Sequence, residues 1–146
     1  MQITDVQGAS KEAVNHPSHY AAHYRREVIE LTARFDFSTG NAMKYVLRCR
    51  FKALPAEDLQ KANWYLNYVI DHPEVGYAMQ EGTEEILADF LEDLSRPGDD
   101  FGREAHRFLR NLVDAVNVTD SESRNRCTRE ASDAVKVLIA RASKTL

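Results

Sequence analysis

Four cationic side chains and no acidic ones lie in the stretch GNAMKYVLRCRFK, residues 40–52. Lys44, Arg48 and Lys52 are four residues apart, so a helix would align them in one ridge opposite an apolar stripe. Asn41 would lie at the N-terminus of that helix, where unpaired backbone N–H groups favour an anion. The pattern predicts a phosphate-binding ridge; the alternative is a basic face that only contacts water.

Aromatic side chains follow on the next expected helix. Trp64, Tyr65 and Tyr68 lie there, with Lys61 beside them. Nucleobases stack on aromatic rings with little dependence on base identity, so cations that face these rings suit a nucleotide. Trp64 and Tyr68 share a helix face at a spacing of four, and they can equally belong to the core or to a protein interface.

Three histidines occur in VNHPSHYAAHY, residues 14–24. A helix would place His16, His19 and His23 on one face, and imidazoles at this spacing can bind a transition metal. No cysteine or acidic fourth ligand stands nearby. Imidazole N–H groups and the Ser18 hydroxyl are also phosphate donors. We therefore expect this segment to contact a phosphate or a base rather than a metal, with a simple solvent-exposed segment as the alternative.

Acidic residues offer two weaker candidates. Glu57 and Asp58 can supply a general base or bind a sugar hydroxyl, but such a pair more often complements the helix dipole. Glu85, Asp89 and Glu92 can share a helix face, as do the Mg²⁺ ligands of all-α nucleotide pyrophosphohydrolases. Few acids on later helices could complete such a cage, so a solvated acidic face is expected. No phosphate-binding loop of the G-x-x-x-x-G-K-[ST] type occurs.

These residues need helices to position them, and the sequence predicts an all-α bundle of five to six helices in a single domain. No window alternates with a period of two, and six glycines leave little for hairpin turns. Helices are expected from about 17 to 36, from Ser38 or Thr39 to about 49, over 55–70, over 84–94 after a Thr83 cap, over 101–116, and from about 120 onward.

Residues 1–13 are polar and aperiodic, which predicts a flexible lead-in. The loop 72–82 is the plausible boundary between a nucleotide-binding core, residues 14–72, and a C-terminal helical part, residues 82–146, that packs on it. Pro55 predicts a helix start there, and Leu59, Ala62, Leu66, Val69 and Ile70 form the buried stripe of that helix.

The bulk composition excludes several classes of protein. A formal net charge of −4 argues against a protein that binds duplex nucleic acid. No apolar run reaches membrane-spanning length, and the N-terminal residues lack the apolar core of a signal peptide, so we expect a cytoplasmic protein without membrane contact. Cys49 and Cys127 are too far apart for a metal motif and are expected to be reduced thiols in the core.

Three blocks of the chain, VNHPSHY, GNAMKYVLRCRFK and EDLQKANWYL, resemble in the same order those of a small phage protein family of nucleotide kinases. The resemblance covers residues 14–70. It implies a deoxynucleoside monophosphate kinase that lacks a standard nucleotide-binding motif, uses ATP as phosphoryl donor and forms a homo-oligomer. It further implies that no divalent metal or other cofactor is required, and that the protein works in the host cytoplasm if it is phage-encoded.

The resemblance also implies site residues. Lys44, Arg48 and His19 would neutralise charge during phosphoryl transfer, helped by Lys52. The substrate-binding residues would be His16, Ser18, Tyr20, Asn41, Tyr45, Lys52, Asp58, Lys61, Trp64 and Tyr65. The chain departs from the family where AAHYRRE replaces a glycine-containing turn and where Cys49, Arg50 and KALPA replace a small residue and a glycine-rich turn. Residues 71–146 match no family block.

Two other functions fit the same residues. The ridge and the aromatic side chains can bind a nucleotide, or a nucleotide signal of host defence, without converting it, so that the protein sequesters it. Alternatively, the chain is a helical protein–protein interaction module in which Trp64 and Tyr68 face a partner.

Overall fold

The computed structural model describes residues 23–145, and it is all-α and forms a single domain, as the sequence predicts. Its helices are α3 (Val28–Thr32), α4 (Phe37–Arg48), α5 (Pro55–Asp71), α6 (Glu84–Ser95), α7 (Asp100–Asn117) and α8 (Ser121–Thr145). Two short 3₁₀ turns, η1 (Cys49–Phe51) and η2 (Pro73–Val75), follow α4 and α5. No helix within this described part has the length and apolar composition needed to cross a bilayer.

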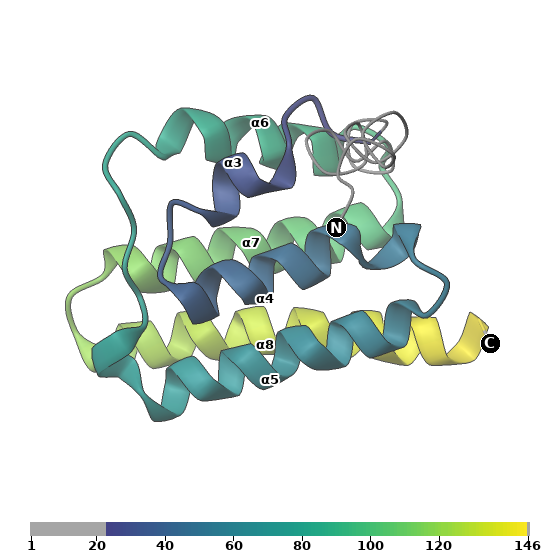
Figure 1. Cartoon of the computed structure of the whole chain (residues 1–146). Coiled ribbons are helices and arrows are strands. Elements are labelled where there is room, and N and C mark those ends of the chain that lie inside the picture. Colours follow the sequence, from purple (N-terminus) through teal and green to yellow (C-terminus); the bar gives the residue numbers. More distant parts are fainter. Residues whose placement is uncertain (1–22, 146) are drawn as a thin grey trace, which may run out of the picture.

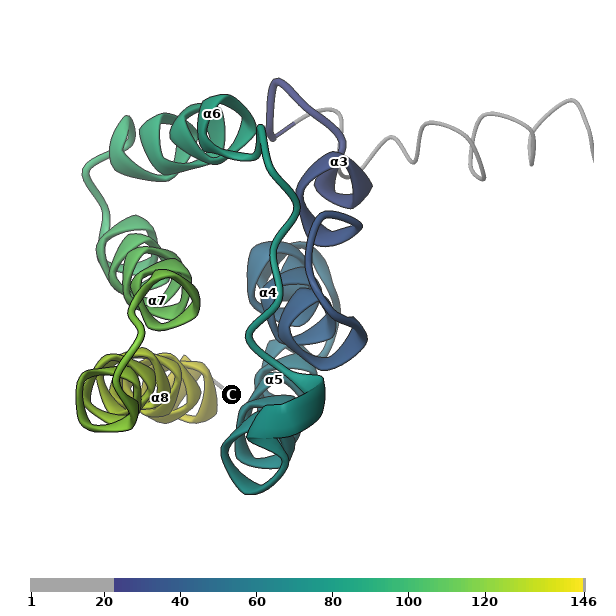
Figure 2. The same ribbon diagram turned by 90° about the vertical axis from the view of Figure 1, so that its left-hand side faces the viewer.

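Four of the helices, α4, α5, α7 and α8, form two layers (Figures 1 and 2). The α4–α5 hairpin is one layer and the α7–α8 hairpin the other, with α5 packed on α8, while α3 and α6 lie across one edge of both layers. One core joins the two layers. Its largest fully buried side chains come from α3 to α7 and include Phe90 and Phe108. The α4–α5 hairpin is therefore held against the C-terminal half of the chain.

Local chemistry explains where the site-bearing helices begin. Asp36 caps α4, because its carboxylate accepts a hydrogen bond from the backbone N–H of Thr39 at 3.1 Å. Pro55 starts α5, and Glu57 and Asp58 in its first turn face the positive end of the helix dipole. Gly40 lets α3 approach α4, since a Cβ there would lie 2.5 Å from the carbonyl oxygen of Thr32.

The structure corrects several expectations about helix boundaries. The helix expected over residues 17–36 is, in its described part, only α3, with turns on both sides. The break between the helices was expected in DFSTG, residues 36–40, but it lies at residues 33–36. Ser38 and Thr39 are buried inside α4 and do not cap it. Thr83 is the N-cap residue of α6, as expected, but its hydroxyl donates to the Gln80 carbonyl and makes no capping hydrogen bond to the helix.

Two residues expected in the core lie nearer the surface. Ile70 is 38% exposed at the end of α5, and Cys127 is half-buried, whereas Cys49 is buried; both thiols are free. The loop 72–82 is held to both halves of the chain. Tyr77 in this loop is buried and shares a hydrogen bond of 2.8 Å with the Thr128 hydroxyl of α8.

Candidate functional site

The second and third sequence blocks meet on the surface shared by α4 and α5, which lie side by side in Figures 1 and 2. We call this surface the α4–α5 face. Its residues are Phe37, Asn41, Lys44, Tyr45 and Arg48 from α4, and Asp58, Lys61, Trp64 and Tyr65 from α5. All but Phe37 were candidates from the sequence.

Tyr45 is the centre of the face, because three cations lie over its ring. Lys44 Nζ lies 4.5 Å, Arg48 Cζ 4.8 Å and Lys61 Nζ 5.6 Å from the ring centroid. The electron-rich face of an aromatic ring attracts a cation, and this attraction offsets part of the repulsion between neighbouring positive charges. The arrangement gathers positive charge from two helices around one half-buried ring.

Two of the three cations are held by carboxylates. Arg48 Nε lies 3.0 Å from Asp58 Oδ2 and its Nη2 lies 3.4 Å from Oδ1, a two-point contact with a buried aspartate. Lys61 pairs with Glu57 at 3.4 Å along α5. The Glu57–Asp58 pair therefore orients cations rather than presenting two unpaired carboxylates. Lys44 forms no ion pair with any residue that the structure describes.

An aromatic surface continues from the cations. Tyr45 stacks on Tyr65 with centroids 6.0 Å apart, and Trp64 meets Tyr65 edge-on at 5.1 Å. Trp64 also stacks on Tyr68 at 5.7 Å and is 60% exposed. Trp64 is thus a surface residue and not part of the core, which leaves ligand or partner binding as its open alternatives.

Phe37 was missed by sequence reasoning. It is 74% exposed and its ring lies 5.9 Å from Tyr65 in an edge-on contact. The available signal was Asp36, a helix-capping residue whose side chain also accepts from the Thr39 hydroxyl at 3.0 Å. A helix that begins after Asp36 places Phe37 in its first turn, beside the candidate residues.

The start of α4 differs from the expected anion site. Asn41 lies one turn inside the helix and donates from Nδ2 to the Phe37 carbonyl at 2.8 Å. The carboxylate of Asp36 already accepts from an N–H group of the first turn. Asn41 and Lys44 instead line a surface pocket of about 330 Å³ together with Phe37 and residues of α3. Lys44, and not the helix end, is therefore the positive group that lines this pocket.

Lys52 does not continue the ridge of Lys44 and Arg48. The α-helix gives way to η1 after Arg48, and Lys52 has extended backbone angles of −111° and 157°. Its side chain lines another pocket, beside Arg50 and Arg141. The third cation near the Tyr45 ring is instead Lys61, which comes from the neighbouring helix α5.

The histidine block falls mostly outside the described residues. His16, Ser18, His19 and Tyr20 lie there, while His23 stacks on Phe51 with centroids 3.7 Å apart. Next to it, the hydroxyl of Tyr24 donates to the Leu47 carbonyl at 2.6 Å. These contacts attach the chain that follows the first block to the C-terminal end of α4. Among residues 23–145 no three His, Cys, Asp or Glu side chains form a metal-sized cluster.

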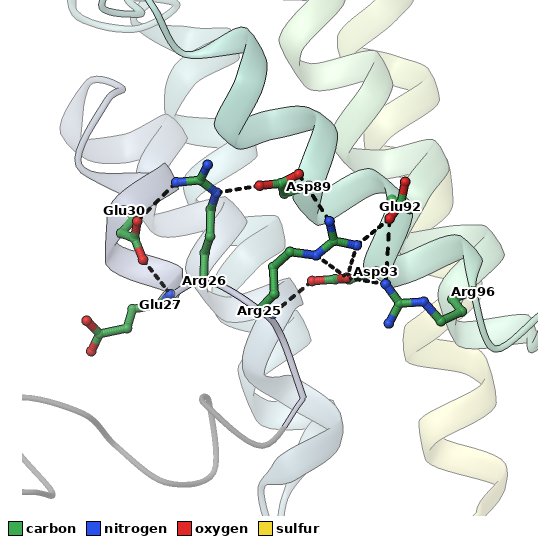
Figure 3. Close-up of polar contacts among 8 residues, drawn as sticks. All are labelled: Arg25, Arg26, Glu27, Glu30, Asp89, Glu92, Asp93 and Arg96. Atoms are coloured by element: carbon green, nitrogen blue, oxygen red, sulfur yellow. Dashed lines mark hydrogen bonds and ion pairs between the residues drawn. The ribbon is translucent and has the colours of Figure 1, made fainter.

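Arginines from the segment before α3 bind the acidic residues of α6 (Figure 3). The backbone N–H of Arg25 donates to Asp93 at 2.9 Å, and its side chain contacts Asp93, Asp89 and Glu92. Arg26 Nε lies 2.7 Å from Asp89. Asp89 and Glu92 are therefore ion-paired and not a purely solvated face. Sequence reasoning missed both arginines, whose only signal was their adjacency in AAHYRRE.

Comparison with known proteins assigns no function to this arrangement. A family model described as a protein of unknown function (DUF3310) matches residues 14–67. The match includes the α4–α5 face and the histidine block, and it ends before α6. No curated protein and no solved structure matches the chain.

Proposed function

We propose that the α4–α5 face binds a nucleoside phosphate and that the protein transfers a phosphoryl group from ATP to a deoxynucleoside monophosphate. The observation that carries the proposal is the gathering of Lys44, Arg48 and Lys61 around Tyr45, next to the exposed ring of Trp64. Cations bind the phosphates, and an exposed aromatic ring stacks a base. The resemblance of residues 14–70 to phage nucleotide kinases supplies the reaction.

The face supports phosphoryl transfer by positioning and by charge. Asp58 holds the Arg48 guanidinium in a fixed orientation, which lowers the cost of binding phosphate oxygens. A terminal oxygen of the acceptor monophosphate would form a bond to the γ-phosphorus of ATP. At the same time the bond between the γ-phosphorus and the oxygen that bridges the β- and γ-phosphates would break. ADP leaves with that electron pair, and the products are ADP and a deoxynucleoside diphosphate. The acceptor is already an anion and needs no strong general base.

The N-terminal block, residues 14–20, is also part of the proposed site. The contact of His23 with Phe51 attaches the residues that follow this block to the end of α4. His19 would add a donor to the phosphates, with His16, Ser18 and Tyr20 in the same block. As the resemblance implies, we also propose that the protein forms a homo-oligomer and that the transfer requires no divalent metal.

A direct assay tests the reaction. The full chain is incubated with ATP and each deoxynucleoside monophosphate, with and without a chelator, and diphosphate is quantified. We expect diphosphate from at least one substrate in both conditions. Lys44→Ala should lower kcat/KM by roughly 10- to 100-fold, because it removes a cation that faces the transferred charge. Lys136→Ala, on the exposed side of α8, is the matched control and should have no effect. Absence of diphosphate above background would contradict the kinase.

A second candidate is binding without conversion. It is favoured by the pairing of Arg48 and Lys61 with Asp58 and Glu57, because the two carboxylates partly offset the positive charge that would have to stabilise a phosphoryl-transfer transition state. Calorimetry with each nucleotide, followed by analysis of the recovered ligand, separates the two candidates. Tight binding that Lys44→Ala weakens, with the ligand unchanged, supports sequestration. If neither Lys44→Ala nor Lys61→Ala alters any nucleotide-induced rise in Tm, the result favours the alternative in which the exposed Trp64 and Tyr68 face a protein partner.

A further inference from the structure

At one end of the bundle α4 and η1 end, α5 and α7 begin and α8 ends (Figure 1). Residues from these elements line another pocket. Its volume is about 410 Å³, within the range of roughly 300–1,000 Å³ that is usual for small-molecule sites. Lys52 lines this pocket, whereas Asn41 and Lys44 line the pocket beside α3. The two pockets are therefore separate, and the nucleotide proposal does not use this one.

The rim of the pocket is cationic. Arg50, Lys52 and Arg141 line it. Arg50 Nη1 lies 3.0 Å from Asp99 and its guanidinium lies 4.3 Å from the ring centroid of Phe101. Arg141 Nη1 lies 2.9 Å from Asp100. These contacts hold the two guanidinium groups in place, and planar guanidinium groups fixed in this way recognise carboxylate or phosphate oxygens.

The charges at the rim do not cancel. Asp99 also accepts a hydrogen bond from the Gly102 N–H at 2.7 Å, and Asp100 also pairs with Arg103 at 2.7 Å. Lys52 has no ion pair with any residue in the described range 23–145. Lys52 is thus a positive charge at the rim that no described carboxylate pairs with, and it gives the rim a positive field that favours an anion.

The wall beneath the rim is apolar. Leu59 and Leu138 are almost fully buried core residues, and Phe101 is half-buried against the core. Cys49 also lines the pocket, and burial raises the pKa of its thiol to about 12. The thiol is therefore neutral at physiological pH, so it is an apolar wall and not a nucleophile. The pocket has the features of a binding site without covalent chemistry.

We propose that this pocket binds a small organic anion, whose apolar body contacts Leu59, Leu138 and Phe101 and whose carboxylate or phosphate group contacts Arg50, Lys52 and Arg141. An apolar wall alone would favour neutral ligands, and a cationic rim alone would favour inorganic ions. Their combination within one pocket favours a ligand that carries both parts.

Methyl NMR titrations of the full chain test the two parts of the ligand separately. The probes are hexyl phosphate, hexanoate, 1-hexanol and inorganic phosphate. We expect hexyl phosphate or hexanoate to shift the Leu59 and Leu138 methyl signals in a saturable way. Hexanol and inorganic phosphate should bind at least about tenfold more weakly, because each lacks one part. Equal affinity for hexanol and both anions would overturn the proposal, as would equal affinity for inorganic phosphate. Whichever of hexyl phosphate and hexanoate binds more tightly identifies the preferred head group.

Variants locate the binding. Lys52→Glu reverses a rim charge without breaking a known ion pair, and it should weaken binding of the preferred anion at least about tenfold. Lys136→Glu makes the same charge change on the exposed side of α8 and should leave the Kd within about twofold. Ala142→Phe should fill the pocket and abolish the methyl shifts. Lys61→Ala, on the α4–α5 face, should leave anion binding intact. Equal Kd values for Lys52→Glu and Lys136→Glu would overturn the proposal.

Discussion

The surroundings of Tyr45 depend on residues that are its neighbours in space and not only in sequence. In the sequence it belongs to an apolar stripe, and in the structure its ring also lies beneath three cations from two helices. Lys44 and Arg48 were predictable because they lie four residues apart on one helix. The pairing of Arg48 with Asp58 was not, because the two residues lie ten positions apart on different helices. Helix periodicity relates residues three and four apart and carries no information about such a pair.

The ion pair between Arg48 and Asp58 should contribute to stability. Asp58→Asn removes the negative charge that faces a partly buried guanidinium, and we expect the free energy of unfolding to fall by about 1–3 kcal/mol. Glu57→Gln, which breaks only the exposed pair with Lys61, is the matched control and should cost about 0.5 kcal/mol or less. Urea denaturation of both variants measures the difference. Equal losses would show that the buried pair contributes nothing beyond a surface pair.

A second prediction concerns acid stability. The pKa of Asp99 is lowered from its ordinary value of 3.8, mainly by the hydrogen bond from the Gly102 N–H and also by Arg50. A lowered folded-state pKa gives stability that is fully present above pH 3.8 and is lost as the pH falls through the lowered value. Asp99→Ala should therefore reduce the free energy of unfolding by about 0.5–2 kcal/mol at neutral pH and by less at acidic pH.

Urea denaturation at pH 6 and pH 3 would check this dependence. Asp133→Ala, an exposed position in the middle of α8, is the control for the loss of one aspartate. Its effect on stability should change little between the two pH values. A loss in Asp99→Ala that is as large at pH 3 as at pH 6 would contradict the role of the carboxylate.

At the scale of elements, the long amphipathic helices were predicted well and the segment before them was not. α5, α6 and α7 begin and end within one or two residues of the expected positions, because proline, acidic first turns and capping residues mark their ends. Residues 23–27 were expected to be helical. They are instead held in turns by contacts to Phe51, Leu47 and α6, which are distant in sequence.

Arg25 should be the strongest link between this segment and α6. Arg25→Met leaves the carboxylate of Asp93, whose side chain is only 4% exposed, with one arginine fewer, and should lower the free energy of unfolding by more than Arg103→Met does. The loss should shrink in high salt, because part of the interaction is with exposed Asp89 and Glu92. Thermal melts at low and high salt give the comparison. Arg103→Met, which removes only an exposed pair with Asp100, is the control. If Arg25→Met lowers stability by the same amount as Arg103→Met, and independently of salt, then Arg25 does not link this segment to α6.

At the scale of the whole molecule, one hydrophobic core includes both halves of the chain. Leu59 and Leu66 of α5 belong to the same cluster as Ala131 and Leu138 of α8. The residues that present the α4–α5 face therefore depend on helices that lie outside the matched family region. The role of residues 84–145 is at least to bury the inner side of the α4–α5 hairpin.

A fragment of residues 1–82 should consequently not fold alone. Separation from α7 and α8 exposes the apolar side of α5 to water, and isolated helices of this length are marginal without tertiary packing. We expect far-UV circular dichroism of the fragment to show well under half of the helicity that α3–α5 contribute in the full chain. A cooperative urea transition of the fragment, with a midpoint like that of the full chain, would show instead an independent nucleotide-binding core.

The sequence by itself determined the all-α class, the helices with clear ends and the identity of most residues on the α4–α5 face. These features depend on periodicity and capping, which act over a few neighbouring residues. Tertiary structure decided that Lys61 replaces Lys52 beside Tyr45, that Asp58 holds Arg48, that arginines before α3 bind the acids of α6, and that a cationic pocket forms at the end of the bundle. Each of these contacts joins groups that are far apart along the chain, and only the packing of helices against each other brings them together.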